Sequence, residues 1–363
     1  MKKRVPRLLL MNPGPVNVSD RVRKALLGPD LCHREPEFSA LLASIREKLL
    51  RVFGISRTHT AAFFTGSGTS AVEAMLSSFA DRRKKILVLL NGVYGERMKK
   101  ILELADTPVL TLVSPIGQFP DLAEIEALLK DDPFIHGVAM VHHETSSGML
   151  NPLAPVGALC KKYKKTFLVD AVSSLGAEHV DFKKYDIGFA AGTSGKCLHG
   201  FPGVSFVIVS NEEAKKLEGK KPRSFYLDLR NALHHQKKND TAFTPAVQVF
   251  YALHEALKEL AAEGLGRRIA NYAERSAVLE KGFIDLGLRF LVEKKYRSHV
   301  LTALWLPAPI SYEKLHDRLK KDGFVIYAGQ SALKDKIFRI ANLGDMHRAD
   351  LKRFLLSLWN ILP

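Results

Sequence analysis

The chain is poor in cysteine, with three among 363 residues, and none of them forms a Cys-x-x-Cys pair. They stand at Cys32, Cys160 and Cys197. This number and spacing argue against a disulfide framework and against a zinc site, so we expect a reducing, cytoplasmic location. The apolar run Leu8 to Met11 is short and is followed at once by Asn12-Pro13-Gly14-Pro15. We therefore expect neither a secretion signal nor a membrane span.

Acidic residues are outnumbered, because 38 Asp and Glu face 54 Lys and Arg, which gives a formal net charge of +16. Such a charge would permit nucleic-acid binding, so its distribution decides. Lysine pairs are spread along the chain without interleaved aromatic residues: Lys84-Lys85, Lys161-Lys162, Lys183-Lys184 and Lys220-Lys221. We expect a solvated basic surface that attracts small anionic substrates, and no nucleic-acid or membrane partner.

Apolar runs typical of strands alternate with helical patterns through the middle of the chain. We expect strands at 86–90, 109–113, 137–142, 166–170, 186–191 and 204–210. Helices are expected at 71–80, 96–104, 121–129 and 155–162. The alternation predicts an α/β fold, in which a mainly parallel sheet lies between helices on both faces. Ligands of such sheets bind at the carboxyl ends of the strands.

The pattern changes towards the C-terminus. Two long helices are expected at 247–263 and 265–286. They are followed by a strand at 300–306, a helix at 312–321, strands at 325–327 and 338–341, and a helix at 348–360. We expect three parts: a segment 1–20 that contributes to the active site or to the small domain, a large domain 21–269, and a small α+β domain 270–363.

Lys196 and Asp170 each follow an apolar strand of the expected sheet. Lys196 lies in Thr193-Ser194-Gly195-Lys196-Cys197-Leu198, a turn between two buried strands that does not suit a surface lysine. An enclosed lysine loses its proton more easily, and the free amine can form an imine with pyridoxal phosphate. That cofactor needs a carboxylate at its ring nitrogen, which Asp170 can supply unless it only caps the following segment. The pair favours a pyridoxal-phosphate site.

Glycines and hydroxyl residues fill Thr65-Gly66-Ser67-Gly68-Thr69-Ser70-Ala71, directly before an expected helix. Such a stretch can bind a phosphate, because the backbone approaches closely and the helix start presents free N–H groups. An ordinary helix cap is one alternative. A dinucleotide fingerprint, and hence a nucleotide-dependent oxidoreductase, is another. That reading expects an acidic residue at the end of the next strand, where Asn91 stands.

Two further stretches follow strand ends. Tyr94 can cover one face of a flat ring or simply pack in the core. The stretch His142-His143-Glu144-Thr145-Ser146-Ser147-Gly148 offers hydroxyls that can bond a ring oxygen. Its adjacent histidines suggest a metal, but neighbours on a strand point to opposite faces, so we expect none.

In order and spacing, these stretches resemble the class V aminotransferases of fold type I. Thr145 stands 25 positions before Asp170, and Lys196 stands 26 positions after it. The resemblance implies a sheet of the seven-stranded type and pyridoxal phosphate bound through Lys196. It assigns the cofactor phosphate to Ser67, Gly68 and Thr69, ring stacking to Tyr94, a ring-oxygen contact to Thr145, and the substrate carboxylate to Arg339. It also implies a homodimer, in which Thr244 reaches the phosphate of the neighbouring subunit.

Within that family, Asp30 to Glu35, Glu144-Thr145 and Lys196-Cys197 look closest to the aminoethylphosphonate branch. This implies amino transfer from 2-aminoethylphosphonate to pyruvate, giving phosphonoacetaldehyde and L-alanine. Alanine:glyoxylate and serine:pyruvate exchange, and a lyase acting on cysteine derivatives, remain alternatives. The chain departs from the family at Gly195, where a polar residue is common, and at Thr241-Ala242, where tyrosine or arginine often occurs.

Overall fold

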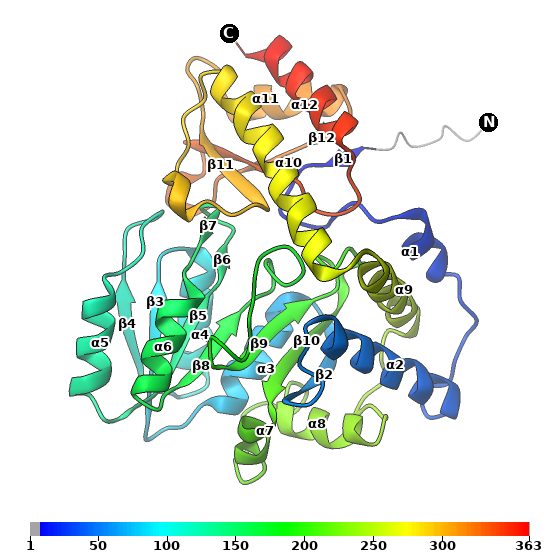
Figure 1. Ribbon diagram of the computed structural model, residues 1–363, viewed down its shortest axis with the longest axis vertical. Coiled ribbons are helices and arrows are strands. Elements are labelled where there is room, and N and C mark those ends of the chain that lie inside the picture. The colour runs from blue at the N-terminus through cyan, green and yellow to red at the C-terminus, as the bar shows by residue number, and fades with distance from the viewer. Residues whose placement is uncertain (1–7, 363) are drawn as a thin grey trace.

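A seven-stranded sheet forms the centre of the computed structural model, which describes residues 8–362 (Figure 1). Its strand order is β2-β10-β9-β8-β5-β3-β4. The strands are β2 (His59–Gly66), β3 (Lys85–Leu90), β4 (Val109–Val113), β5 (Ile135–Val141), β8 (Thr166–Asp170), β9 (Ile187–Thr193) and β10 (Gly203–Ser210). All neighbours pair in parallel except β10, which is antiparallel to β2 and β9. The expected α/β fold with a mainly parallel sheet is confirmed.

Helices cover both faces because successive strand residues point to opposite sides. In β3, Leu87 and Leu89 face one apolar core, and Ile86 and Val88 face the other. The first core is closed by α2 (Pro36–Val52), α5 (Leu122–Asp131), α6 (Leu153–Lys162) and α9 (Val247–Glu263). The second is closed by α3 (Gly68–Phe79), α4 (Val93–Leu104), α7 (Asn211–Leu217) and α8 (Leu229–Lys237). With both faces covered, the strand ends are left as the place for a ligand.

The C-terminal part lies above the sheet in Figure 1 and has its own apolar core. It holds a three-stranded sheet of order β11-β14-β13, with helices beside it. Its elements are α10 (Leu265–Asp285), β11 (Leu301–Trp305), α11 (Tyr312–Lys321), β12 (Phe324–Val325), β13 (Tyr327–Ala328), β14 (Ile337–Ala341) and α12 (Arg348–Ile361). The single strand expected at 325–327 is therefore wrong, because β12 and β13 belong to different sheets.

The N-terminal segment joins the C-terminal part. Strand β1 (Leu9–Leu10) pairs in parallel with β12, and Met11 lies in the C-terminal core. Helix α1 (Asp20–Ala25) follows and packs on α9. The first seven residues of the expected segment 1–20 lie outside the described residues, and the division at 20 and 269 stays a prediction. No helix among residues 8–362 has the length and apolar character needed to cross a membrane.

Candidate active site

The carboxyl edge of the sheet brings the predicted residues together. Asp170 is the last residue of β8, and Lys196 comes three positions after the end of β9. Tyr94 follows β3 in the first turn of α4. Thr145 follows β5, in the turn between the short strands β6 (His143–Glu144) and β7 (Met149–Leu150). Parallel strands place their carboxyl ends at one edge, so four separate stretches meet there.

Lys196 lies in a tightly packed turn. Its Nζ donates a hydrogen bond to the carbonyl of Pro13. Gly14 has a φ of 126°, which favours glycine, and a Cβ there would lie 2.4 Å from this Nζ and displace the tip of the lysine. Burial lowers the pKa of Lys196 to about 8, and the positive charges of Arg339 and Arg97 act in the same direction. About a tenth of this amine is therefore uncharged at pH 7, far more than for an ordinary lysine, and only the uncharged amine is a nucleophile.

Gly195, the departure from the family pattern, has a steric cause. A Cβ at this position would lie 2.8 Å from the backbone nitrogen of Pro202 and 2.9 Å from its Cα. Backbone atoms move less easily than a side-chain tip, so a polar residue before Lys196 would force this turn apart.

Asp170 is a buried carboxylate with one free oxygen. Its Oδ1 accepts a hydrogen bond of 3.0 Å from the Val172 N–H, and its Oδ2 has no partner among residues 8–362. Burial raises the pKa of Asp170 to about 6, against the opposing effects of that N–H, Arg97 and Lys196. The group is therefore mainly ionised at neutral pH and can accept a proton-bearing nitrogen at Oδ2.

The start of α3, at Ser67, Gly68 and Thr69, is the predicted phosphate site and is called the anion cradle below. Ser67 is the N-cap residue, yet its side chain makes no capping hydrogen bond. The first N–H groups of a helix lack intrahelical partners and favour negative charge. A Cβ on Gly68 would lie 2.6 Å from Val172 Cγ1, so glycine lets this helix start approach the loop after Asp170. Thr69 adds a hydroxyl, which accepts a hydrogen bond of 3.0 Å from Arg97 Nη1.

Glu144 connects two of these stretches and was not predicted as a site residue. Its Oε2 accepts hydrogen bonds from the N–H groups of Tyr94, at 3.1 Å, and Gly95, at 3.3 Å. Its Oε1 accepts one of 3.1 Å from the Ser146 N–H. The carboxylate thus caps α4 and fixes Tyr94 relative to the turn that holds Thr145. Burial raises its pKa. The sequence signal for this contact was the glycine in Asn91-Gly92. In the structure a Cβ at Gly92 would lie 2.4 Å from Glu144 Cδ, so glycine is needed for the carboxylate to approach α4.

Arg339 reaches the edge from the C-terminal part. It lies on β14, is 2% exposed, and donates from Nη1 to the Thr145 carbonyl at 2.9 Å. Its Nε donates to the Ala328 carbonyl at 2.8 Å, and Nη1 also contacts Gln330 Oε1 at 3.2 Å. In the part of the chain that the structure describes, Arg339 forms no ion pair and its Nη2 has no hydrogen-bond partner. A buried guanidinium without a carboxylate is costly unless a ligand supplies the anion.

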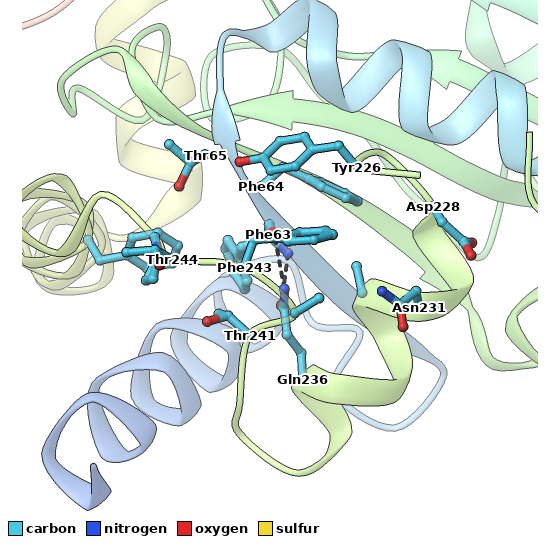
Figure 2. A pocket seen from close by; sticks show the side chains of 14 residues that line it. Phe63, Phe64, Thr65, Tyr226, Asp228, Asn231, Gln236, Thr241, Phe243 and Thr244 are labelled. Carbon is cyan, nitrogen blue, oxygen red and sulfur yellow. Dashed lines mark hydrogen bonds between the residues drawn. The ribbon is translucent and has the colours of Figure 1, made fainter. Parts of the chain in front are cut away.

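Thr244 is exposed and lies in the loop before α9. Figure 2 shows it beside a small cavity that also presents Thr65, Phe243 and Tyr226. The rings of Tyr226 and Phe243 stack with centroids 4.9 Å apart. Thr65 stands two residues before Ser67, so the cavity adjoins the strand that leads to the anion cradle. Contact of Thr244 with a neighbouring subunit stays a prediction.

The adjacent histidines of the predicted stretch, His142 and His143, are both buried. Burial lowers the pKa of His142 to about 3 and also lowers that of His143. His143 Nδ1 lies 3.0 Å from the carbonyl of Ser173. Among residues 8–362, no three His, Cys, Asp or Glu side chains gather as a metal site would require.

Comparison with known proteins gives one consistent result. The family model described as "Aminotransferase class-V" matches residues 24–354. Curated 2-aminoethylphosphonate–pyruvate transaminases are similar to this chain. That of Bacillus cereus is 34% identical and covers 96% of each chain, and that of Klebsiella pneumoniae is 35% identical and covers 98% of this chain and 97% of the relative.

Solved structures agree in fold over almost the whole length. A subgroup IV aspartate aminotransferase from Thermus thermophilus superposes with a TM-score of 0.90 at 30% identity, covering 98% of this chain and 100% of the other. An alanine–glyoxylate aminotransferase from Nostoc sp. gives a TM-score of 0.93 at 28% identity, covering 100% of this chain and 97% of the other.

Proposed function

Since this chain belongs to the class-V aminotransferases, we propose that it transfers the amino group of 2-aminoethylphosphonate to pyruvate, which yields phosphonoacetaldehyde and L-alanine. Transaminase activity and the use of pyridoxal phosphate follow from the family. The substrate pair is supported by relatives of that name that match nearly the full chain.

The residues at the sheet edge fit the cofactor. An amine with lowered pKa is available at Lys196, and the free Oδ2 of Asp170 can pair with a protonated ring nitrogen. The uncapped start of α3, at Ser67 and Gly68, suits a phosphate. We assign Thr69 to the phosphate, Tyr94 to the ring face and Thr145 to the ring oxygen. When bound, the cofactor withdraws electrons from the substrate carbon.

The protein's own part in the reaction is proton handling and positioning. Lys196 Nζ would act as the base that removes the proton from the substrate carbon and as the acid that returns it. Its lowered pKa suits both directions, because a general base works best when its pKa lies near the operating pH. Asp170 keeps the proton on the ring nitrogen by remaining ionised beside it. Two half-reactions in one site imply ping-pong kinetics.

Arg339 is the single observation that carries the substrate class. It is buried at the site with Nη2 free, and it forms no ion pair with a carboxylate of the described chain. A guanidinium binds carboxylate or phosphonate through two parallel hydrogen bonds, so both the keto acid and a phosphonate amine suit it. The net charge of +16 would further concentrate a doubly negative donor.

A donor panel with pyruvate tests the proposal. The holoenzyme is mixed with 2-aminoethylphosphonate, alanine or serine, and bleaching of the cofactor absorbance band is followed. We expect 2-aminoethylphosphonate to bleach the band fastest. A band that responds to alanine or serine but not to the phosphonate amine would refute the substrate and leave the transaminase. Alanine–glyoxylate exchange is the second candidate, because that structural neighbour matches with a TM-score of 0.93.

The proposed assembly is a homodimer with shared active sites. Phe225 is 86% exposed and packs against Phe243, with ring centroids 5.5 Å apart, beside the Thr244 loop. An aromatic group of this kind on a surface is typical of an interface. Light scattering should give twice the chain mass, and Phe225→Glu should lower it. We also propose a cytoplasmic location, supported by three cysteines that are all free.

A further inference from the structure

Arg97 is a charged residue at the site to which none of the steps above gives a role. It lies on α4 three positions after Tyr94, so the two side chains share a face of the helix. Its charge lowers the pKa of both Asp170 and Lys196, which shows that the guanidinium faces the sheet edge and not only solvent. In the region that the structure describes, Arg97 forms no ion pair.

The hydrogen bond from Arg97 constrains the Thr69 hydroxyl. Arg97 Nη1 donates to Thr69 Oγ1 at 3.0 Å, and a guanidinium can only donate. One lone pair of the hydroxyl is thereby occupied, so its O–H is left to donate elsewhere. Thr69 stands in the first turn of α3, where the N–H groups favour an anion, and a charge-assisted bond strengthens the hydroxyl as a donor.

Arg97 also contacts the aromatic side chain at the site. Its guanidinium carbon lies 4.6 Å from the centre of the Tyr94 ring. A planar cation stacked on one face of a ring restricts that ring and leaves the other face for a ligand. The same side chain therefore touches a residue of the anion cradle and the aromatic residue beside it.

We propose that Arg97 is a positioning residue for the cofactor phosphate, which orients the Thr69 hydroxyl as a donor and holds the Tyr94 ring in place. The inference rests on the proposed role of Thr69. Arg97 would be the source of positive charge near the anion cradle. Such a source matters in this chain because Gly195 has no polar side chain that could contact the phosphate. Lysine cannot replace Arg97 fully, because an ammonium group is not planar and cannot both stack on the Tyr94 ring and donate to Thr69.

Binding of pyridoxal phosphate and of pyridoxal to the apo-enzyme tests this role without any amine donor. Arg97→Gln should weaken pyridoxal phosphate about tenfold, since a charge-assisted hydrogen bond is lost. It should weaken pyridoxal, which has no phosphate, less than about threefold, and Arg97→Lys should fall between wild type and Arg97→Gln. Lys100→Gln, which removes an exposed charge from the same helix, is the matched control and should change neither constant.

A double-mutant cycle separates a positioning role from a merely structural one. In a Thr69→Val background, Arg97→Gln should add less than about a twofold loss, because the two residues act through one contact. Unchanged affinity in Arg97→Gln, equal weakening of both ligands, or full additivity with Thr69→Val would each overturn the inference. Because no donor is present, a failed donor panel leaves this result standing, and the two proposals fail separately.

Discussion

The two edges of the central sheet differ in whether their basic side chains form ion pairs. At the amino edge, Lys85 opens β3 and pairs with Asp132 at 2.7 Å, and Lys216 pairs with Glu213 at 2.9 Å beside the start of β8. At the carboxyl edge, Lys196 and Arg339 are more buried, yet neither forms an ion pair within the described residues. The basic side chains at the amino edge are thus neutralised by carboxylates, as is usual on a surface. Those at the carboxyl edge have no such partner, as is expected of a site that binds an anion.

This difference shows how a net charge of +16 can be read. Most basic residues are solvated or paired, and such pairs contribute little. The informative basic groups are Lys196 and Arg339, because a buried charge without a partner is normally unfavourable. We interpret them as groups whose partner is provided by the bound cofactor or substrate. They destabilise the apo-enzyme, and this loss of stability is tolerated because the groups are needed for binding and catalysis.

Replacing Lys196 should have the largest effect on this contrast. In Lys196→Met the amine is lost while the volume is kept, so no covalent link to the cofactor forms and no proton is carried. We expect kcat/KM with pyruvate to fall by at least roughly 10⁴-fold. Stopped-flow absorbance should show no imine band. Residual activity above a few per cent would mean that another amine takes part.

Asp170→Asn should follow in size. Asparagine is nearly isosteric but cannot hold a proton on the ring nitrogen, so the electron sink weakens and kcat should fall roughly 10²-fold or more. Asp132→Asn at the amino edge is the matched control, and its kcat should stay within about twofold of wild type. Equal kcat values in the two variants would remove Asp170 from the mechanism.

The strands of this sheet were largely predictable, because both faces are buried and each strand reads as an apolar run. β4 and β8 begin and end at the predicted residues. β2 was missed, since His59-Thr60 opens it and Thr65-Gly66 closes it with few branched apolar residues between. The helix α2 was missed as well. It was hidden by interspersed polar residues, although Leu42, Ile45 and Leu49 follow helical spacing.

The part of the site that lies at the ends of strands could be predicted from the sequence. Asp170 and Lys196 directly follow apolar runs, and parallel strands gather such positions at one edge. Arg339 came only from the family resemblance, because nothing local indicates that β14 brings this side chain to the carbonyl of Thr145. Glu144 and Arg97 act through contacts between residues 28 to 50 positions apart, which no local pattern encodes.

Arg339→Lys should act on binding more than on chemistry. A lysine keeps the charge but cannot pair with a carboxylate through two bonds or hold the Thr145 carbonyl in the same geometry. We expect KM for pyruvate to rise roughly 10- to 100-fold with a smaller change in kcat. Steady-state kinetics over both substrates resolve the two constants. A fall in kcat alone would contradict a binding role.

The cost of the unpaired lysine should be visible in the apo-enzyme. Its pKa falls from 10.5 in the unfolded chain to about 8 in the fold. Between these values the unfolded state binds more protons, so stability rises with pH, and the cost is fully present below about pH 8. Lys196→Met should therefore stabilise the apo-enzyme by about 3 kcal/mol at pH 7 and by nothing above pH 10.5. Urea unfolding at both pH values measures it, and a gain independent of pH would point to packing instead.

The smallest effect should come from the amino edge. Lys85→Gln breaks the pair with Asp132, but the lysine side chain is 42% exposed, so water replaces the lost contact. We expect the melting temperature to shift by less than about 2 °C and kcat/KM to change less than about twofold. High salt should shrink even this shift, because exposed pairs are screened. A loss of activity in Lys85→Gln as large as in Arg339→Lys would break the comparison, since it would mean that paired and unpaired charges serve the same site.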